Sequence, residues 1–172
     1  MKGMFGTKIS NLLGNPVVKT LLPAAAVAVF GFVLLNLTFL FAFLFDFLIN
    51  SLATGIVNFF FKVDPMRAYS WFPPIKHALF AVIIGLISWP VFKSRLGVIY
   101  KATYMTVPSA VVLATIGILL YRWPAVVYLL GGLSIIGVLL YFYRTRKPWL
   151  YYYSVILVGL ALTVFSLLGG EI

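Results

Sequence analysis

The chain contains 172 residues, of which 63% are hydrophobic and 9% are charged, and its mean hydropathy is +1.12. No water-soluble domain of this size needs so much apolar surface, so the composition indicates a polytopic integral membrane protein. The absence of cysteine excludes disulfides, thiolate nucleophiles and zinc–sulfur sites. The single histidine, His77, excludes a two-histidine haem or an HExxH zinc site from this chain alone. We therefore expect neither a metal nor a cofactor.

The charge of the chain is strongly positive, because 13 Lys and Arg residues outnumber three acidic residues and give a formal net charge of +10. The basic residues stand in short clusters between apolar runs, where they act as topology signals and as contacts for anionic lipid. No cluster is large enough to carry several phosphate contacts, so we expect the lipid bilayer and no nucleic acid as a partner.

Charges and prolines divide the chain into five apolar segments, each long enough to cross a hydrocarbon layer about 30 Å thick. In chain order, the predicted spans cover residues 20–45, 75–92, 102–121, 124–143 and 148–168. The first segment is too long for a secretory signal, and its small residues stand at its start, so we expect a retained helix. The turns between the last three spans are very short, which predicts antiparallel neighbours. Residues 1–172 are expected to form one membrane domain.

After the first span, the uncharged run continues beyond Asp46 and becomes amphipathic. Polar residues recur there at every fourth position, namely Asp46, Asn50, Thr54, Asn58 and Lys62. Leucine, isoleucine and phenylalanine fill most of the other half of the helical wheel. The pattern predicts an amphipathic helix over residues 46–62, which lies at the membrane interface or folds against the bundle. The predicted fold is thus an all-α bundle of five membrane helices with one interfacial helix.

The distribution of Lys and Arg predicts an orientation, since five spans divide them nine to four between the two sides. The richer side carries the N-terminus, which places the N-terminus in the cytoplasm and the C-terminus outside, with the prokaryotic inner membrane as the default. A six-span alternative makes residues 21–61 a helical hairpin and divides the same residues seven to six. It needs a turn in a stretch that has no Gly or Pro between Gly31 and Gly55.

Asp46 is the acidic residue that lies inside or at the end of an apolar segment, and a carboxylate at membrane depth is costly enough to suggest function. One interpretation is structural, with a carboxylate near the outer surface that begins the amphipathic helix. The other is a cavity that passes a cation, a proton or a small polar solute. The predicted solute or ion pathway comprises Asp46, Asn36, Asn50, Thr54 and Asn58.

Small residues at three- or four-residue spacing mark faces on which helix backbones can approach closely. They are Ala24, Ala28 and Gly31 in the first span, Ala110 and Ala114 in the third, and Gly131 and Ser134 in the fourth. Such faces serve packing within the bundle or docking to another subunit, and the sequence leaves both interpretations open.

No nucleophile with a base, facing carboxylates or zinc triad can be assembled from the chain, so we expect no enzyme. Two functional classes follow. In the first, the chain is a small transporter, channel or substrate-capturing membrane subunit, with its polar stripe completed by oligomerisation. In the second, it is a non-catalytic structural or accessory subunit that docks to a larger membrane complex through its small-residue faces. The polar stripe favours the first class, because it exceeds what anchoring in a bilayer requires.

Overall fold

The computed structural model describes residues 16–60 and 72–168, and at positions 53, 54, 56–60 and 72–74 it describes the backbone alone. The described residues form five α-helices and no strand, and all five helices are long and apolar enough to cross a membrane. The prediction of an all-helical chain with five candidate membrane spans is confirmed. The helices are α2 (Pro16–Phe60), α4 (Phe72–Lys93), α5 (Val98–Leu119), α6 (Pro124–Arg144) and α7 (Trp149–Leu167).

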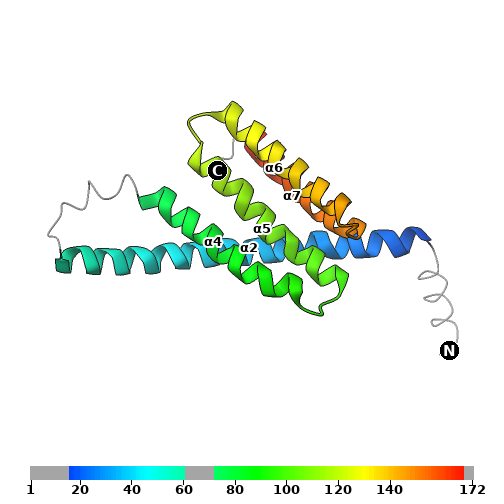
Figure 1. Cartoon of the computed structure of the whole chain (residues 1–172), viewed down its shortest axis with the longest axis horizontal. Coiled ribbons are helices and arrows are strands. Elements are labelled where there is room, and N and C mark those ends of the chain that lie inside the picture. Colours follow the sequence, from blue (N-terminus) through cyan, green and yellow to red (C-terminus); the bar gives the residue numbers. More distant parts are fainter. Residues whose placement is uncertain (1–15, 61–71, 169–172) are drawn as a thin grey trace.

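Helix α2 is the longest element, with 45 residues, which corresponds to roughly 68 Å at the rise of an α-helix. It runs along the long axis of the molecule, and α4, α5, α6 and α7 lie obliquely across it (Figure 1). Both ends of α2 project beyond the other four helices in this view. The length exceeds the hydrocarbon thickness of a bilayer about twofold, so α2 must tilt strongly or extend beyond the membrane.

A separate amphipathic helix over residues 46–62 is not shown, because α2 continues through Asp46 without a break as far as Phe60. The stretch between Gly31 and Gly55 contains no Gly or Pro to end the helix. Asn50 Nδ2 also donates a hydrogen bond to Asp46 Oδ2 one turn away at 2.9 Å, a contact that suits a continuous helix. Residues 61 and 62 of the predicted segment lie outside the described residues.

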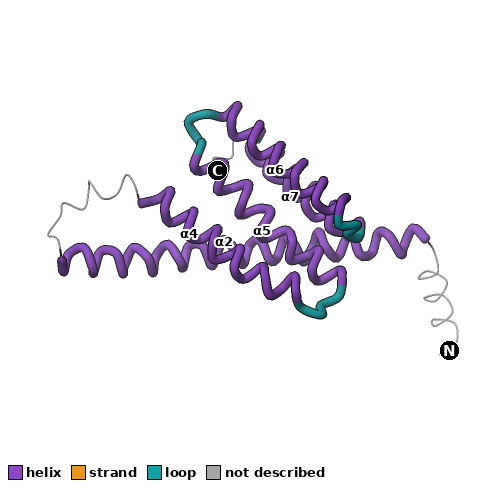
Figure 2. Tube along the Cα trace, in the orientation of Figure 1, coloured by secondary structure: helices purple, strands orange, loops and turns teal. Residues whose placement is uncertain are grey.

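Helix α5 is the centre of the bundle and packs against α2, α4, α6 and α7. Seven of its residues are buried, compared with Val27 and Gly31 in α2 and Phe142 in α6. Short turns connect α4 to α5, α5 to α6 and α6 to α7 (Figure 2). The expected antiparallel order of the last three helices follows from these turns.

Three apolar clusters hold the helices together. Phe80 and Ile84 of α4 pack with Val107 and Val111 of α5, and Leu34, Ala42 and Phe45 of α2 cover them. Val27, Ala102 and Leu150 join α2, α5 and α7 near the start of each helix. Phe142, Tyr151 and Val155 join α6 to α7 near the α6–α7 turn, where Phe92 of α4 also packs. Van der Waals packing of these side chains stabilises the contacts between the helices.

Candidate functional site: a polar cluster between α2 and α4

Asp46, Asn50 and Lys76 form a closed polar cluster where the two helices face each other. Lys76 Nζ forms an ion pair with Asp46 Oδ1 and donates a second hydrogen bond to Asn50 Oδ1 at 3.1 Å. Asn50 Nδ2 completes the ring through its 2.9 Å hydrogen bond to Asp46 Oδ2. The Lys76 ammonium, the Asn50 amide and the Asp46 carboxylate thus form hydrogen bonds with one another. A charged group in apolar surroundings requires such partners.

The two charged partners differ in exposure, since the Lys76 side chain is 10% exposed and the Asp46 side chain is 46% exposed. Asp46 is the one acidic residue in the part of the chain that the structure describes. A buried ammonium therefore faces a carboxylate that remains open on one side. This openness gives a ligand or a second subunit access to the carboxylate.

Aromatic rings of both helices pack together next to the polar cluster in sequence. The Phe80 ring lies one turn after Lys76 on α4, and its centroid is 5.6 Å from that of Phe45 and 5.9 Å from that of Phe41. These tilted contacts are typical of well-packed aromatic pairs. The rings separate the polar cluster from the apolar centre of the helices.

The position of the cluster along α4 places it at one end of the bundle. Lys76 is the second residue of the candidate span Ile75–Lys93, and it lies roughly 25 Å along the helix from Lys93. If this span crosses a bilayer about 30 Å thick, Asp46 lies near one boundary of the hydrocarbon layer.

Of the five predicted pathway residues, the structure brings Asp46 and Asn50 together. Asn36 is exposed, and its Nδ2 donates to the backbone oxygen of Phe32 at 2.7 Å, one turn before it on the same helix. It lies ten residues before Asp46, about 15 Å along α2, and takes no part in the cluster. The side chains of Thr54 and Asn58 lie outside the described residues.

Lys76 is the member of the polar cluster that the sequence analysis did not predict, because it counted there only toward the positive charge on the outer side of the membrane. Its pairing with Asp46 joins positions 30 residues apart. A signal was present, because a basic residue within the first turns of one span can face a carboxylate at the matching end of the span before it. The neighbouring residue, His77, is half-buried.

The predicted small-residue faces contact other helices of the same chain to different degrees. A Cβ atom at Gly31 would lie 2.9 Å from Thr106 Cγ2 of α5, so the backbone of α2 meets α5 closely there. Ala110 is buried at 8% exposure, and Ala24, Ala28 and Ala114 are half-buried. A Cβ atom at Gly131 would reach Leu113 of α5 at 3.7 Å, an ordinary contact distance. Much of the small-residue surface is therefore occupied by packing within the chain.

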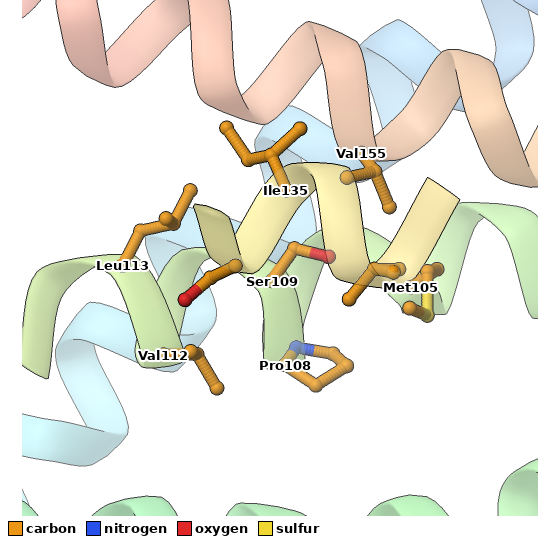
Figure 3. A pocket seen from close by; sticks show the side chains of 9 residues that line it. Met105, Pro108, Ser109, Val112, Leu113, Ile135 and Val155 are labelled. Atoms are coloured by element: carbon orange, nitrogen blue, oxygen red, sulfur yellow. The ribbon is translucent and has the colours of Figure 1, made fainter. Parts of the chain in front are cut away.

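A small apolar cavity lies between α5, α6 and α7, with a volume of about 130 Å³. Figure 3 shows Met105, Leu113, Ile135 and Val155 around it, with the Ser109 side chain as a polar group on the α5 side. Ser134 of α6 also lines it. This pocket is partly open, and its lining residues belong to other helices than the polar cluster of α2 and α4.

Hydroxyl groups in the central helices bond to their own backbones. Thr106 Oγ1 donates to Thr103 O at 2.7 Å, and Ser154 Oγ donates to Tyr151 O at 2.9 Å. Both side chains are buried, so these bonds satisfy groups that would otherwise be costly in an apolar core. Within one copy of the described chain, the polar groups of the α2–α4 cluster do not extend into α5 and α7.

Among the described residues, no three His, Cys, Asp or Glu side chains gather as a metal site would require. Comparison of the chain with models of protein families, with curated proteins and with solved structures finds no match.

Proposed function

We propose that the chain is a small transporter- or channel-type membrane subunit that captures an ion or a small polar solute at Asp46, Asn50 and Lys76. The observation that supports this proposal is the half-exposed Asp46 carboxylate, which is held by a buried lysine of another helix in an otherwise apolar chain. An ionisable pair in such surroundings marks ion and substrate pathways more often than it marks anchoring. The carboxylate suits a cation or a proton, and the ammonium suits an anion.

Capture requires the ring of hydrogen bonds to open, because each charged group is neutralised by the other. An entering cation takes the place of Lys76 beside the carboxylate, whereas an entering anion takes the place of Asp46 beside the ammonium. The Phe41, Phe45 and Phe80 rings exclude water on the inner side and act as the seal. Because apolar helices lie beyond this seal, we propose that a second copy or another membrane subunit along α2 completes the route.

The test is ion flux into vesicles that contain the purified full chain. Gradients of protons, Na⁺, K⁺ and Cl⁻ are applied in turn, and flux through the wild type is compared with that through Asp46→Asn and Lys76→Met. We expect at least one ion to pass and both variants to reduce its flux. The exchange variant Asp46→Lys/Lys76→Asp is the matched control, because it keeps an ion pair between the helices and reverses the charges that face the open side. Full flux with unchanged ion preference in all three variants would overturn the proposal.

We propose further that the protein resides in a prokaryotic plasma membrane with its N-terminus in the cytoplasm. The nine-to-four division of Lys and Arg supports this orientation. The chain has no cysteine of its own, so Arg146→Cys and Arg122→Cys can be labelled one at a time with a membrane-impermeant thiol reagent. We expect intact cells to label position 122 alone, and labelling of position 146 alone would reverse the orientation.

A second candidate is an accessory subunit of a larger membrane complex, and the exposure of α2 supports it. Among the described side chains of α2 only Val27 and Gly31 are buried within the chain, although the helix has 45 residues. A photoreactive amino acid at Phe43, which is 75% exposed, tests it against the same group at Leu160 of α7, which is 61% exposed. One protein adduct of fixed mass at position 43 and lipid adducts at position 160 would support the accessory role. Lipid adducts at both positions would contradict it.

A further inference from the structure

Five exposed basic side chains lie at the end of the bundle opposite the polar cluster, and we name them the basic rim. Two of them belong to the α4–α5 turn and three to the α6–α7 turn. They are Lys93, Arg95, Arg144, Arg146 and Lys147. Figure 2 shows both turns at the same end of the molecule.

The two turns of the basic rim are joined by an apolar cluster beneath them. Phe92, which precedes Lys93, packs against the cluster of Phe142, Tyr151 and Val155. Phe142 in turn lies two residues before Arg144. The two turns of the rim are therefore held on one packed apolar base.

The charges of the basic rim are uncompensated within the described part of the chain, where none of the five residues forms an ion pair. The one described acidic residue, Asp46, is paired with Lys76 at the other end. A neighbouring lysine, Lys101, is excluded from the rim because its ammonium donates to the backbone oxygens of Phe92 at 2.8 Å and Ser94 at 2.6 Å. What the rim offers is positive charge that points outward.

The backbone at Arg146 supports the idea that this turn is built to present charge. Arg146 has φ of 49°, and its amide donates to Tyr143 O while the Lys147 amide donates to Phe142 O. This is the helix ending in which the left-handed residue is usually glycine. An arginine there costs stability relative to glycine, and it places a guanidinium on the exposed side of the turn.

Exposed aromatic residues border the same turn. Tyr143 is 78% exposed and Trp149 is 47% exposed. Lys93 lies over the Trp89 ring at 5.8 Å from its centroid, on the neighbouring helix end. Tyrosine and tryptophan favour the headgroup region of a bilayer, which would place the charges of the rim beside lipid phosphates.

We propose that the basic rim binds the phosphate groups of anionic phospholipids in the leaflet that it faces. The cations supply the attraction, since each basic side chain near an anionic surface strengthens binding roughly fivefold. The aromatic residues fix the depth of the turns, and the left-handed Arg146 turns its own charge outward. This binding is independent of any flux at Asp46.

The experiment uses the full chain in phosphatidylcholine vesicles that contain a small fraction of spin-labelled phosphatidylglycerol. The fraction of immobilised label, compared with that of spin-labelled phosphatidylcholine, gives the preference of the protein for the anionic lipid. We expect the wild type to prefer phosphatidylglycerol by at least about threefold and the preference to fall with added salt. Arg144→Gln/Arg146→Gln/Lys147→Gln should remove most of it. Arg146→Gly, which keeps the turn, should lower it in part.

Arg122→Gln is the matched control, because Arg122 is an exposed arginine at the opposite end of the bundle. Its Nε donates a hydrogen bond to the Tyr121 hydroxyl at 3.0 Å, which raises the pKa of the guanidinium. We expect this variant to keep the wild-type preference. The proposal is overturned if the triple variant keeps the preference, or if Arg122→Gln lowers it as much. It is also overturned if inorganic phosphate abolishes the preference at an ionic strength where sodium chloride does not, because the rim would then serve soluble phosphate.

Discussion

Helix α4 carries a lysine near each of its ends, and the two side chains have opposite surroundings. Lys76 is 10% exposed and bonds to Asp46 and Asn50 of α2. Lys93 is exposed and lies over the Trp89 ring. A charge at the end of a membrane helix can thus be stabilised by pairing inside the protein or by exposure at the membrane surface. The first solution joins two helices, and the second leaves the charge available to lipid.

The strongest test of this contrast removes one charge from each end. Asp46→Asn takes away the negative charge that faces the buried Lys76 ammonium, and we expect it to lower the free energy of unfolding by roughly 2–3 kcal/mol. The loss is smaller than for a fully buried pair, because Asp46 is 46% exposed. Lys93→Met at the other end should change the same quantity by less than about 0.5 kcal/mol. Unfolding in one detergent, followed by circular dichroism, measures both.

The exchange variant Asp46→Lys/Lys76→Asp serves as the control for that test. It should recover more than half of the lost stability, because it restores an ion pair between α2 and α4. Equal and small losses for Asp46→Asn and Lys93→Met would show that the two ends do not differ as proposed.

A second test asks whether the close packing of α2 on α5 contributes to stability without affecting the lipid preference of the basic rim. Gly31→Ala places a methyl group 2.9 Å from Thr106 Cγ2. Thr106 cannot move easily, because it is 1% exposed and its hydroxyl bonds to Thr103. We expect a loss of roughly 1–2 kcal/mol in unfolding free energy and no change in the lipid preference of the basic rim, which α2 does not build.

Gly85→Ala is the matched control for Gly31, since a Cβ atom at Gly85 has nothing within 4 Å. It should be neutral or slightly stabilising, as is usual for glycine in the middle of a helix. Thr106→Ser removes the methyl group that obstructs Gly31→Ala, so the double variant should regain stability relative to Gly31→Ala alone. If Gly85→Ala is as harmful as Gly31→Ala, close packing of α2 on α5 is not the cause.

Lys101 provides a third test. It lies at the same end of the bundle as the basic rim, but its ammonium forms hydrogen bonds within the protein, as that of Lys76 does. Its ammonium donates to the backbone oxygens of Phe92, in the last turn of α4, and of Ser94, which follows the helix. The Phe92 oxygen is among the carbonyls that the end of a helix leaves unpaired. Lys101→Met should therefore cost about 1 kcal/mol of unfolding free energy and leave the phosphatidylglycerol preference unchanged. A loss of lipid preference without a loss of stability would assign Lys101 to the basic rim instead.

The five helices were predictable because the length and hydropathy of an apolar run are properties of the local sequence. Prolines and charges also marked most helix ends, such as Pro124 at the start of α6. The expected break at Asp46 is absent from the structure. An amphipathic pattern describes the faces of a helix and not its ends, so it could not show where α2 ends. Between Gly31 and Gly55 nothing in the sequence stops a helix, and α2 continues to Phe60.

The polar cluster was predictable in part, for a similar reason. Asp46 was identified by the cost of a carboxylate in an apolar run, and Asn50 by its position one turn later. Lys76 depends on how α4 packs on α2, and neither hydropathy nor helical periodicity contains that information. Asn36 was included because it is polar, but its amide bonds to the Phe32 carbonyl of its own helix. A list of polar residues thus does not separate those that meet from those that are satisfied locally.

The smallest change in unfolding free energy is expected at Arg146. Variants at this position distinguish the contribution of the residue to stability from the contribution of its charge to lipid binding. Arg146→Gly removes the left-handed strain of a residue with φ of 49°, so the unfolding free energy should rise by about 0.5–1 kcal/mol. The same change removes one of the five charges of the basic rim, so the preference for phosphatidylglycerol should fall. Arg146→Gln serves as the control, because it removes the charge and keeps the strain, and it should lower the preference without raising stability. If Arg146→Gly raises the unfolding free energy and lowers the preference for phosphatidylglycerol, the arginine at this turn destabilises the fold and strengthens lipid binding. At Lys76, in contrast, stability and charge depend on the same contact.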